Sequence, residues 1–318
     1  MFRRKNRFVL MALVVMLLMG IPAATTFARA PGGPNGLHTV TTFTPGAFPE
    51  SLAIAADGDM YVSFGFIGNV MRISPDGQKQ DLFATLDVGN GLITGLAFDP
   101  AGNLYVAAAT FSAEPKSYVA KVAPNGHTTT LATLPEGSFP NGVAFKDGYL
   151  YVSDSDLATI WKIDGYGNVD SWLEDSRLAP TKGIGANGIA FDDAGDLWIA
   201  VSDSGSILRV PRAADGSAMT PVLVKQSASL KTADGVAFDV NGDLYITVNN
   251  TNALYVLRHN GKLCRLASAV NGLSYPTQPA FGRTAETMKT LFITNGALKH
   301  GTADLVSMQL GVEGLPLP

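Results

Sequence analysis

One phrase recurs six times along the chain at nearly constant spacing. Each copy has an apolar segment with alternating polarity, a turn rich in Asp, Gly and Asn, and a second apolar segment. Five near-equal intervals indicate a repeat architecture in which each copy is one structural unit. The copies begin at Glu50, Thr94, Asn141, Asn187, Asp234 and Gln278, which are separated by 44, 47, 46, 47 and 44 residues.

Each copy is followed by two further strand-like segments, so the unit holds four strands. The third copy, for example, has the alternating pair Val143 and Phe145, the segment 150–152 after a turn, and then the apolar segment 159–163. Four strands in about 46 residues match the size of a propeller blade. We therefore predict an all-β chain that folds as a six-bladed β-propeller of four-stranded antiparallel blades.

The two ends of the repeat region predict how the ring closes. Residues 37–50 resemble residues 126–141, a stretch that holds a fourth strand and leads into the next copy. The last copy is followed by only one more strand-like segment, residues 304–310. We expect the N-terminal strand to complete the last blade, because this pairing covers two edges that would otherwise invite aggregation.

The first thirty residues predict export. A basic start precedes the apolar segment 8–19, and the small-residue pattern Ala28-Arg29-Ala30 follows. We interpret residues 1–30 as a signal peptide and residues 31–318 as a single propeller domain, secreted or periplasmic. The apolar segment is shorter than the ~20 residues of a spanning helix. We therefore expect no stable membrane span after cleavage, with an uncleaved anchor as the alternative.

The charge distribution argues against a nucleic-acid partner. The chain has 23 basic and 27 acidic residues, a net charge of -4. Five of the basic residues lie in residues 1–30, where no Asp or Glu occurs, so the remainder has 18 basic against 27 acidic residues and a net charge of -9. Such a body repels phosphate backbones.

The residue that opens each copy is the main candidate for chemistry. In a propeller the first strand of every blade lines the central channel, so these six positions should converge on the axis. All six side chains offer oxygen, and none offers sulfur, imidazole or a fixed positive charge. This donor set favours a hard cation. Calcium is the first choice because it accepts six to eight oxygen ligands in a relaxed geometry, although another divalent cation is possible.

Other interpretations compete at these and similar positions. Asn and Asp before Gly are common turn residues where a loop enters a strand. Asp239, Asn241 and Asp243 resemble a calcium-loop fragment, but the same turn pattern recurs at residues 192–196, so we interpret both as turns. An aromatic column with the period of the blades is expected to pack between neighbouring sheets: Tyr61, Tyr105, Tyr151, Trp198, Tyr245 and Phe292.

The phrases PNGVAFKDGYLYVSDS from Pro140 and ADGVAFDVNGDLYIT from Ala233 resemble the SMP-30/gluconolactonase/LRE-like family. Its six-bladed superfamily includes calcium phosphotriesterases and paraoxonases. There, a Glu from the first blade, Asn residues from middle blades and an Asp from the fifth bind a central metal. The resemblance implies that the matching positions in this chain are metal ligands: Glu50, Asn141, Asn187 and Asp234.

The implied activity is metal-dependent hydrolysis of a small-molecule lactone or related ester, with Asp234 as both ligand and catalytic residue. Loops on one face of the propeller would form the substrate pocket, with Phe48, Phe139 and Tyr275 at its rim. The residues predicted for this pocket are Thr94, Gln278, Asp154, Asp203, Asn249 and Asn295. The alternatives are a noncatalytic ligand- or protein-binding propeller with a structural axial metal, and a lyase or synthase on the same scaffold.

Overall fold

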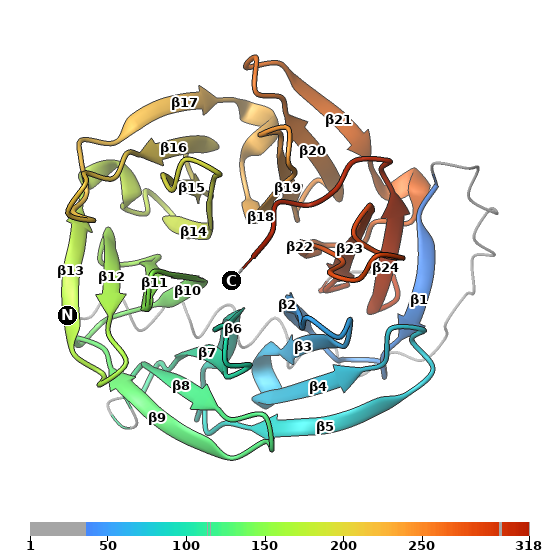
Figure 1. Cartoon of the computed structure of the whole chain (residues 1–318), viewed down its shortest axis with the longest axis horizontal. Coiled ribbons are helices and arrows are strands. Elements are labelled where there is room, and N and C mark those ends of the chain that lie inside the picture. Colours follow the sequence, from blue (N-terminus) through green and yellow to red (C-terminus); the bar gives the residue numbers. More distant parts are fainter. Residues whose placement is uncertain (1–35, 113, 115, 299–300, 318) are drawn as a thin grey trace.

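The computed structural model describes residues 36–112, 114, 116–298 and 301–317. They form six four-stranded antiparallel sheets in a ring, with the first strand of each sheet nearest the axis (Figure 1). The predicted six-bladed propeller is therefore confirmed. The predicted signal peptide at residues 1–30 lies outside the described residues.

The first five blades take their four strands consecutively from the chain. From the axis outward, blade one consists of β2 (Pro49–Ile54), β3 (Met60–Phe64), β4 (Asn69–Ile73) and β5 (Gln80–Thr85). Blade two consists of β6 (Leu92–Phe98), β7 (Leu104–Ala109), β8 (Tyr118–Val122) and β9 (Thr128–Thr133). Blade three consists of β10 (Pro140–Lys146), β11 (Tyr149–Asp154), β12 (Thr159–Ile163) and β13 (Val169–Glu174). Blade four consists of β14 (Ala186–Phe191), β15 (Leu197–Val201), β16 (Ser206–Val210) and β17 (Val222–Gln226). Blade five consists of β18 (Ala233–Phe238), β19 (Leu244–Val248), β20 (Ala253–Leu257) and β21 (Leu263–Ala267).

The sixth blade combines strands from both ends of the chain. It consists of β22 (Pro276–Phe281), β23 (Thr290–Asn295), β24 (Asp304–Gln309) and, outermost, β1 (His38–Thr42). β1 pairs antiparallel with β24, so that Thr39 lies opposite Val306. This pairing confirms the predicted closure and leaves neither terminal strand with a free inner edge.

The helices of the described residues are single 3-10 turns in the loops between strands. They are η1 (Gly65–Ile67), η2 (Ser176–Leu178), η3 (Ala228–Leu230) and η4 (Ala269–Asn271). None of the helices within residues 36–317, as far as these are described, is long and apolar enough to cross a membrane.

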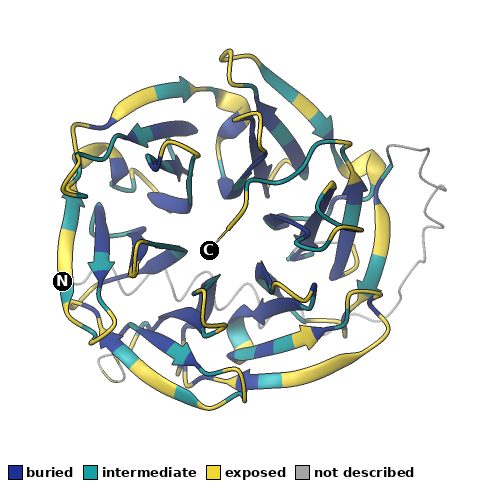
Figure 2. Cartoon of the chain, in the orientation of Figure 1, coloured by how far each residue is buried: buried dark blue, intermediate teal, exposed yellow. Residues whose placement is uncertain are grey.

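The hydrophobic core lies between the sheets rather than at one centre, and the buried strands surround the axis (Figure 2). Aromatic rings of the second strands pack against phenylalanines of the next blade's first strand, edge-on for Tyr61, Tyr151, Trp198 and Tyr245 and stacked for Tyr105. The Tyr151 and Phe191 centroids are 4.9 Å apart, and those of Tyr245 and Phe281 are 5.3 Å apart. The predicted packing role of the aromatic column is thus confirmed for the first five members, and Phe292 packs in the cluster beside blade one.

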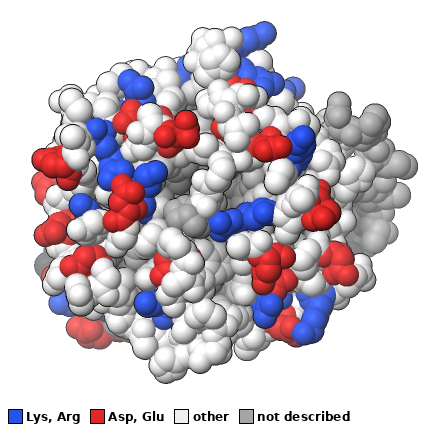
Figure 3. Space-filling view, viewed as in Figure 1, with Lys and Arg blue, Asp and Glu red and all other residues white. Residues whose placement is uncertain are grey.

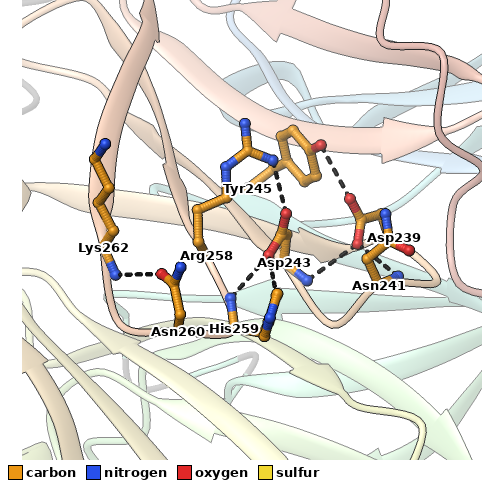
Figure 4. A network of polar contacts seen from close by, with 8 residues as sticks. All are labelled: Asp239, Asn241, Asp243, Tyr245, Arg258, His259, Asn260 and Lys262. Carbon is orange, nitrogen blue, oxygen red and sulfur yellow. Dashed lines mark hydrogen bonds and ion pairs between the residues drawn. The ribbon is translucent and has the colours of Figure 1, made fainter.

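The turn between β18 and β19 is held by its own side chains (Figure 4). The Asp239 carboxylate accepts hydrogen bonds from the backbone of Asn241 and Asp243 and from the Tyr245 hydroxyl, at 2.9, 3.0 and 3.1 Å. Asp243 is bound by Arg258 at 2.7 Å. These bonds occupy the carboxylates with protein donors, so the interpretation as a turn is confirmed.

Candidate functional site

Glu50, Asn141, Asn187 and Asp234 all lie on innermost strands, at interruptions of the strand pairing. In β2, β10, β14 and β18 the register with the second strand shifts at the segment that holds the residue, for example between Ala233 and Val236. A bulge adds an unpaired residue and redirects its side chain. All six first strands have this shift, so the four predicted ligands leave the regular alternation at equivalent positions of blades one, three, four and five.

The carboxylates of Glu50 and Asp234 act on each other across the channel. The pKa of Glu50 is well above its usual range because burial desolvates the carboxylate and because the charge of Asp234 repels it. Burial also raises the pKa of Asp234 to about 7, although hydrogen bonds from Asn249 and Asn187 oppose the rise. A bound divalent cation would favour the ionised form of both carboxylates and so offset the cost of burying their charges.

Two serines fix the orientation of the axial asparagines. The Asn141 amide nitrogen donates to Ser155 Oγ at 3.1 Å, and that hydroxyl donates to the Ala186 carbonyl at 2.6 Å. The Asn187 amide nitrogen donates to Ser202 Oγ at 3.0 Å, and that hydroxyl donates to the carbonyl of the next blade's first strand. Because each nitrogen is engaged, the amide oxygen is the atom left to bind a cation.

Sequence reasoning missed these serines. Ser155 and Ser202 occupy the same repeat position, directly after the second strand of blades three and four, and each follows its asparagine by 14 or 15 residues. The shared spacing is a usable signal. Two residues before Ser155, the Ser153 hydroxyl binds the next blade in the same way and donates to the Asn187 carbonyl at 2.6 Å.

Asn249, predicted for the substrate pocket, lies beside the catalytic candidate. Its amide nitrogen donates to Asp234 Oδ2 at 3.1 Å, while its own Oδ1 is buried without a hydrogen-bond partner in the described structure. An orphaned buried carbonyl oxygen carries a cost of roughly 1–3 kcal/mol. A cation or a water molecule that a cation holds would satisfy it.

The donors in this cluster fit a hard divalent cation. They are two carboxylates and the amide oxygens of Asn141, Asn187 and Asn249, which are the ligand types that calcium accepts. The described residues contain no group of three or more His, Cys, Asp or Glu side chains that could hold a metal. The amides must therefore complete the coordination, and the charge of two carboxylates would balance the ion.

The other two residues that open a copy face other partners. The Thr94 hydroxyl hydrogen-bonds the carbonyls of Ala107 and Pro140, at 3.3 and 3.0 Å, and so links blade two to blade three. The Gln278 side chain donates to the Pro279 carbonyl at 2.9 Å. Among the six axial positions, the structure links Asp234 with Glu50 and with Asn187. The ligand role of Asn141 and the pocket role of Thr94 and Gln278 stay predictions.

Asp154, Asp203 and Asn295 hold loops on the face of the axial carboxylates. Asp154 accepts from the Phe139 backbone at 3.0 Å and from Trp161 Nε1 at 2.9 Å. Asp203 accepts from the backbone of the loop at 181–183. Asn295 accepts from the Ser274 backbone and donates to Gly272 and Asp304. Contact of these three residues with a substrate stays a prediction.

Tyr275, predicted at the rim, lies close enough to the site to respond to both carboxylates. Burial raises the pKa of its phenol, and the charges of Asp234 and Glu50 raise it further. Its backbone has a φ of 53°, which is unusual for a bulky residue. A 2.7 Å hydrogen bond from its N–H to Asn252 Oδ1 helps to hold this conformation.

A cavity of about 760 Å³ occupies the other end of the channel. Its lining includes Gln278 but none of the other residues that open a copy. Residues 313–317 cross this end, on the face seen in Figures 1 and 3, where Leu315 N–H donates to the Phe238 carbonyl at 2.9 Å. Acidic and basic side chains alternate in small groups on this face (Figure 3). The perturbed carboxylates lie elsewhere, so we take the axial cluster as the candidate site.

Without a cation, the protein is expected to lose stability as the pH rises from about 4 to 7. Over this range the unfolded chain releases the protons of Glu50 and Asp234, because the ordinary pKa of both carboxyl groups is about 4, while the folded state retains these protons. Each unit of pKa difference corresponds to roughly 1.4 kcal/mol of unfolding free energy. Thermal melts in chelator across this range measure the effect, and a flat profile would contradict the burial of the two carboxylates in the folded state.

The geometry defines a class of protein, namely six-bladed propellers with carboxylate and amide side chains on the axis. Residues 95–221 match the family model described as the SMP-30/Gluconolactonase/LRE-like region. This match to part of the chain confirms the resemblance inferred from the repeated phrases, and the chain folds as a six-bladed propeller. No curated protein sequence matches the chain significantly.

Solved structures with the same fold include enzymes and a calcium-binding protein. A luciferin-regenerating enzyme has a TM-score of 0.69 at 13% identity, over 89% of this chain and 98% of its own. Regucalcin from Agrobacterium tumefaciens, a calcium-binding protein, has a TM-score of 0.66 at 16% identity, over 87% and 97%. A catalytically inactive variant of virginiamycin B lyase from Staphylococcus aureus, solved with quinupristin, has a TM-score of 0.60 at 17% identity, over 83% and 80%. At these identities the likeness establishes the fold alone.

Proposed function

We propose that this protein is an exported, divalent-cation-dependent hydrolase of a lactone or related ester. The observation that carries the proposal is the pair of carboxylates with raised pKa values, Glu50 and Asp234, beside amides whose oxygens are left free. Calcium is the proposed cation, which the description of regucalcin as a calcium-binding protein supports. Export rests on the signal pattern of residues 1–30.

Each residue of the cluster has a distinct role in this reaction. A bound divalent cation supplies polarisation of the substrate carbonyl and stabilises the negative charge that develops on its oxygen. Glu50, Asn141, Asn187 and Asp234 would hold the cation. Asp234 would accept the proton of the attacking water, with Asn249 fixing its carboxylate through the 3.1 Å hydrogen bond.

Chelation tests the proposal directly. A panel of lactones and aryl esters is assayed with the exported protein in excess calcium and again in excess chelator. We expect turnover in calcium to fall at least about 100-fold in chelator and to return when calcium is restored, since charge stabilisation at the carbonyl is lost. Turnover that persists unchanged in chelator would refute the metal-dependent mechanism.

A noncatalytic propeller with a structural ion is the second candidate. The ligands come from blades one, three, four and five, so a bound cation would cross-link the ring. This function predicts a calcium-dependent rise in melting temperature with no turnover of any ester in the panel. A propeller that hydrolyses a substrate only when calcium is bound would exclude it.

A further inference from the structure

An apolar cluster joins five blades on the face of the candidate site. Its buried members are Phe48, Leu92, Ala109 and Phe139, and its partly buried members are Phe66, Phe111, Ile184, Tyr275 and Leu298. These residues come from the loops and strand ends of blades one, two, three, four and six. Side chains from five blades can share one contact cluster only where the blades converge, so the cluster surrounds the axis.

The cluster is adjacent to the polar donors along the chain and in space. Phe48 is two residues before Glu50, and Phe139 is two residues before Asn141. The Tyr275 phenol belongs to the cluster and yet responds to the charges of Glu50 and Asp234. A substrate whose carbonyl approaches these carboxylates must therefore rest its remaining atoms against aromatic and aliphatic side chains.

The aromatic rings are held firmly in place. The Phe48 ring lies 5.0 Å from that of Phe66 and 6.2 Å from that of Tyr275, between centroids. A Cβ added at Gly296 would come within 2.8 Å of the Phe48 ring, so this glycine allows the ring to pack against the loop after β23. A rigid apolar surface is suited to bind a substituent without further ordering cost.

Charge and hydrogen-bonding capacity complete the argument. The axial cluster contains two carboxylates, Glu50 and Asp234, and its other donors are the neutral amides of Asn141, Asn187 and Asn249. A divalent cation would bring this site close to neutrality, which favours a neutral substrate over an anionic one. A polyhydroxylated substrate would desolvate several hydroxyl groups against the rings of this cluster, at a cost for each hydroxyl that stays unpaired.

We infer that the substrate is a neutral lactone or ester with an alkyl or aryl substituent, rather than a polyhydroxylated sugar lactone. The substituent contacts Phe48, Phe66 and Phe139 while the carbonyl faces Asp234. This inference rests on the proposed function for its reaction, but binding to the apolar cluster does not require turnover. Each methylene that becomes buried should tighten binding about fourfold.

Two δ-lactams that cannot be hydrolysed as esters test the inference independently of activity. One carries a hexyl group and the other carries ring hydroxyls, and binding of each to the calcium-loaded full chain is measured by titration calorimetry. We expect the hexyl lactam to bind at least about tenfold tighter. Equal or tighter binding of the hydroxylated lactam, or no binding of either, would overturn the inference.

Variants localise the effect. Phe66 is partly exposed in η1, so Phe66→Ser should preserve the fold while weakening hexyl-lactam binding about tenfold and leaving the hydroxylated lactam unchanged. Phe66→Leu should restore most of the affinity. Tyr166 is a 94% exposed aromatic residue that is not part of the cluster. Tyr166→Ser is therefore the matched control and should change the affinity for neither lactam. Loss of hexyl-lactam preference in Tyr166→Ser but not in Phe66→Ser would place the substituent elsewhere and overturn the inference.

The corresponding lactones separate this inference from the proposed function. If the hexyl lactam binds but neither lactone is hydrolysed in calcium, the proposed hydrolase function fails and the apolar site stands. If the hydroxylated lactone is hydrolysed more efficiently than the hexyl lactone, the function stands and the inferred substrate class fails.

Discussion

Asp234→Asn is expected to lower kcat/KM for lactone hydrolysis by at least about 100-fold while the propeller remains folded. The substitution keeps the shape of the side chain but removes the negative charge and the proton acceptor. The buried carboxylate, with its pKa raised to about 7, disfavours folding when ionised, so its neutral replacement should raise the melting temperature of the metal-free protein at pH 8. Lower activity together with higher metal-free stability is the signature of a functional carboxylate.

Calcium titration and a second aspartate supply the controls for Asp234→Asn. Stabilisation by calcium at pH 8 should shrink in this variant because one of two charged ligands is gone. Asp239→Asn alters a carboxylate of the same blade that binds the Tyr245 hydroxyl and two backbone N–H groups. It should lower stability without weakening the calcium response. Full activity in Asp234→Asn would remove this residue from the mechanism.

Gly188→Ala is expected to destabilise the protein by about 3 kcal/mol or more, the largest stability effect that we predict for a single added methyl group. A Cβ at this position would lie 2.2 Å from the Asp234 carbonyl oxygen and 2.8 Å from the Gly235 Cα. Backbone atoms of the adjacent first strand cannot rotate away. Blades four and five must therefore separate at the height of the site, which should also displace Asn187 and weaken calcium binding.

A matched glycine tests this steric explanation. A Cβ at Gly165, in the exposed turn after β12, meets no atom within 4 Å, so Gly165→Ala should leave the unfolding free energy within about 0.5 kcal/mol of the parent. Denaturant unfolding of the two variants gives the comparison. Equal stabilities would mean that the first strands separate at little cost, contrary to the close packing around the axis.

The number of blades, their strand order and the ring closure could be predicted because they depend on local pattern. Alternation with period two identifies strands, Asp- and Gly-rich turns separate them, and a repeat of about 46 residues fixes the unit. The missing fourth strand of the last copy even identified the partner of β24. The same repetition drew attention to the axial column that contains Glu50 and Asp234.

The composition of the candidate site could be predicted only in part. Position in the repeat suggested six equivalent oxygen donors, but Thr94 hydrogen-bonds blade three and Gln278 lines the opposite cavity. Local sequence cannot distinguish these arrangements, because the orientation of each side chain depends on the hydrogen-bond partners that the neighbouring blade offers. Asn249 and the serines that orient the amides likewise act through contacts between the first and second strands.

Local periodicity in the chain was sufficient to specify six blades and an oxygen-rich axis, since strand formation and repeat length depend on neighbouring residues. The direction of each amide, the raised pKa of Asp234 and the apolar surface around Phe48 arise only in the closed ring. They depend on register shifts and on contacts between blades distant in sequence. Desolvation and charge repulsion act through space, so they exist only once the fold has brought these groups together.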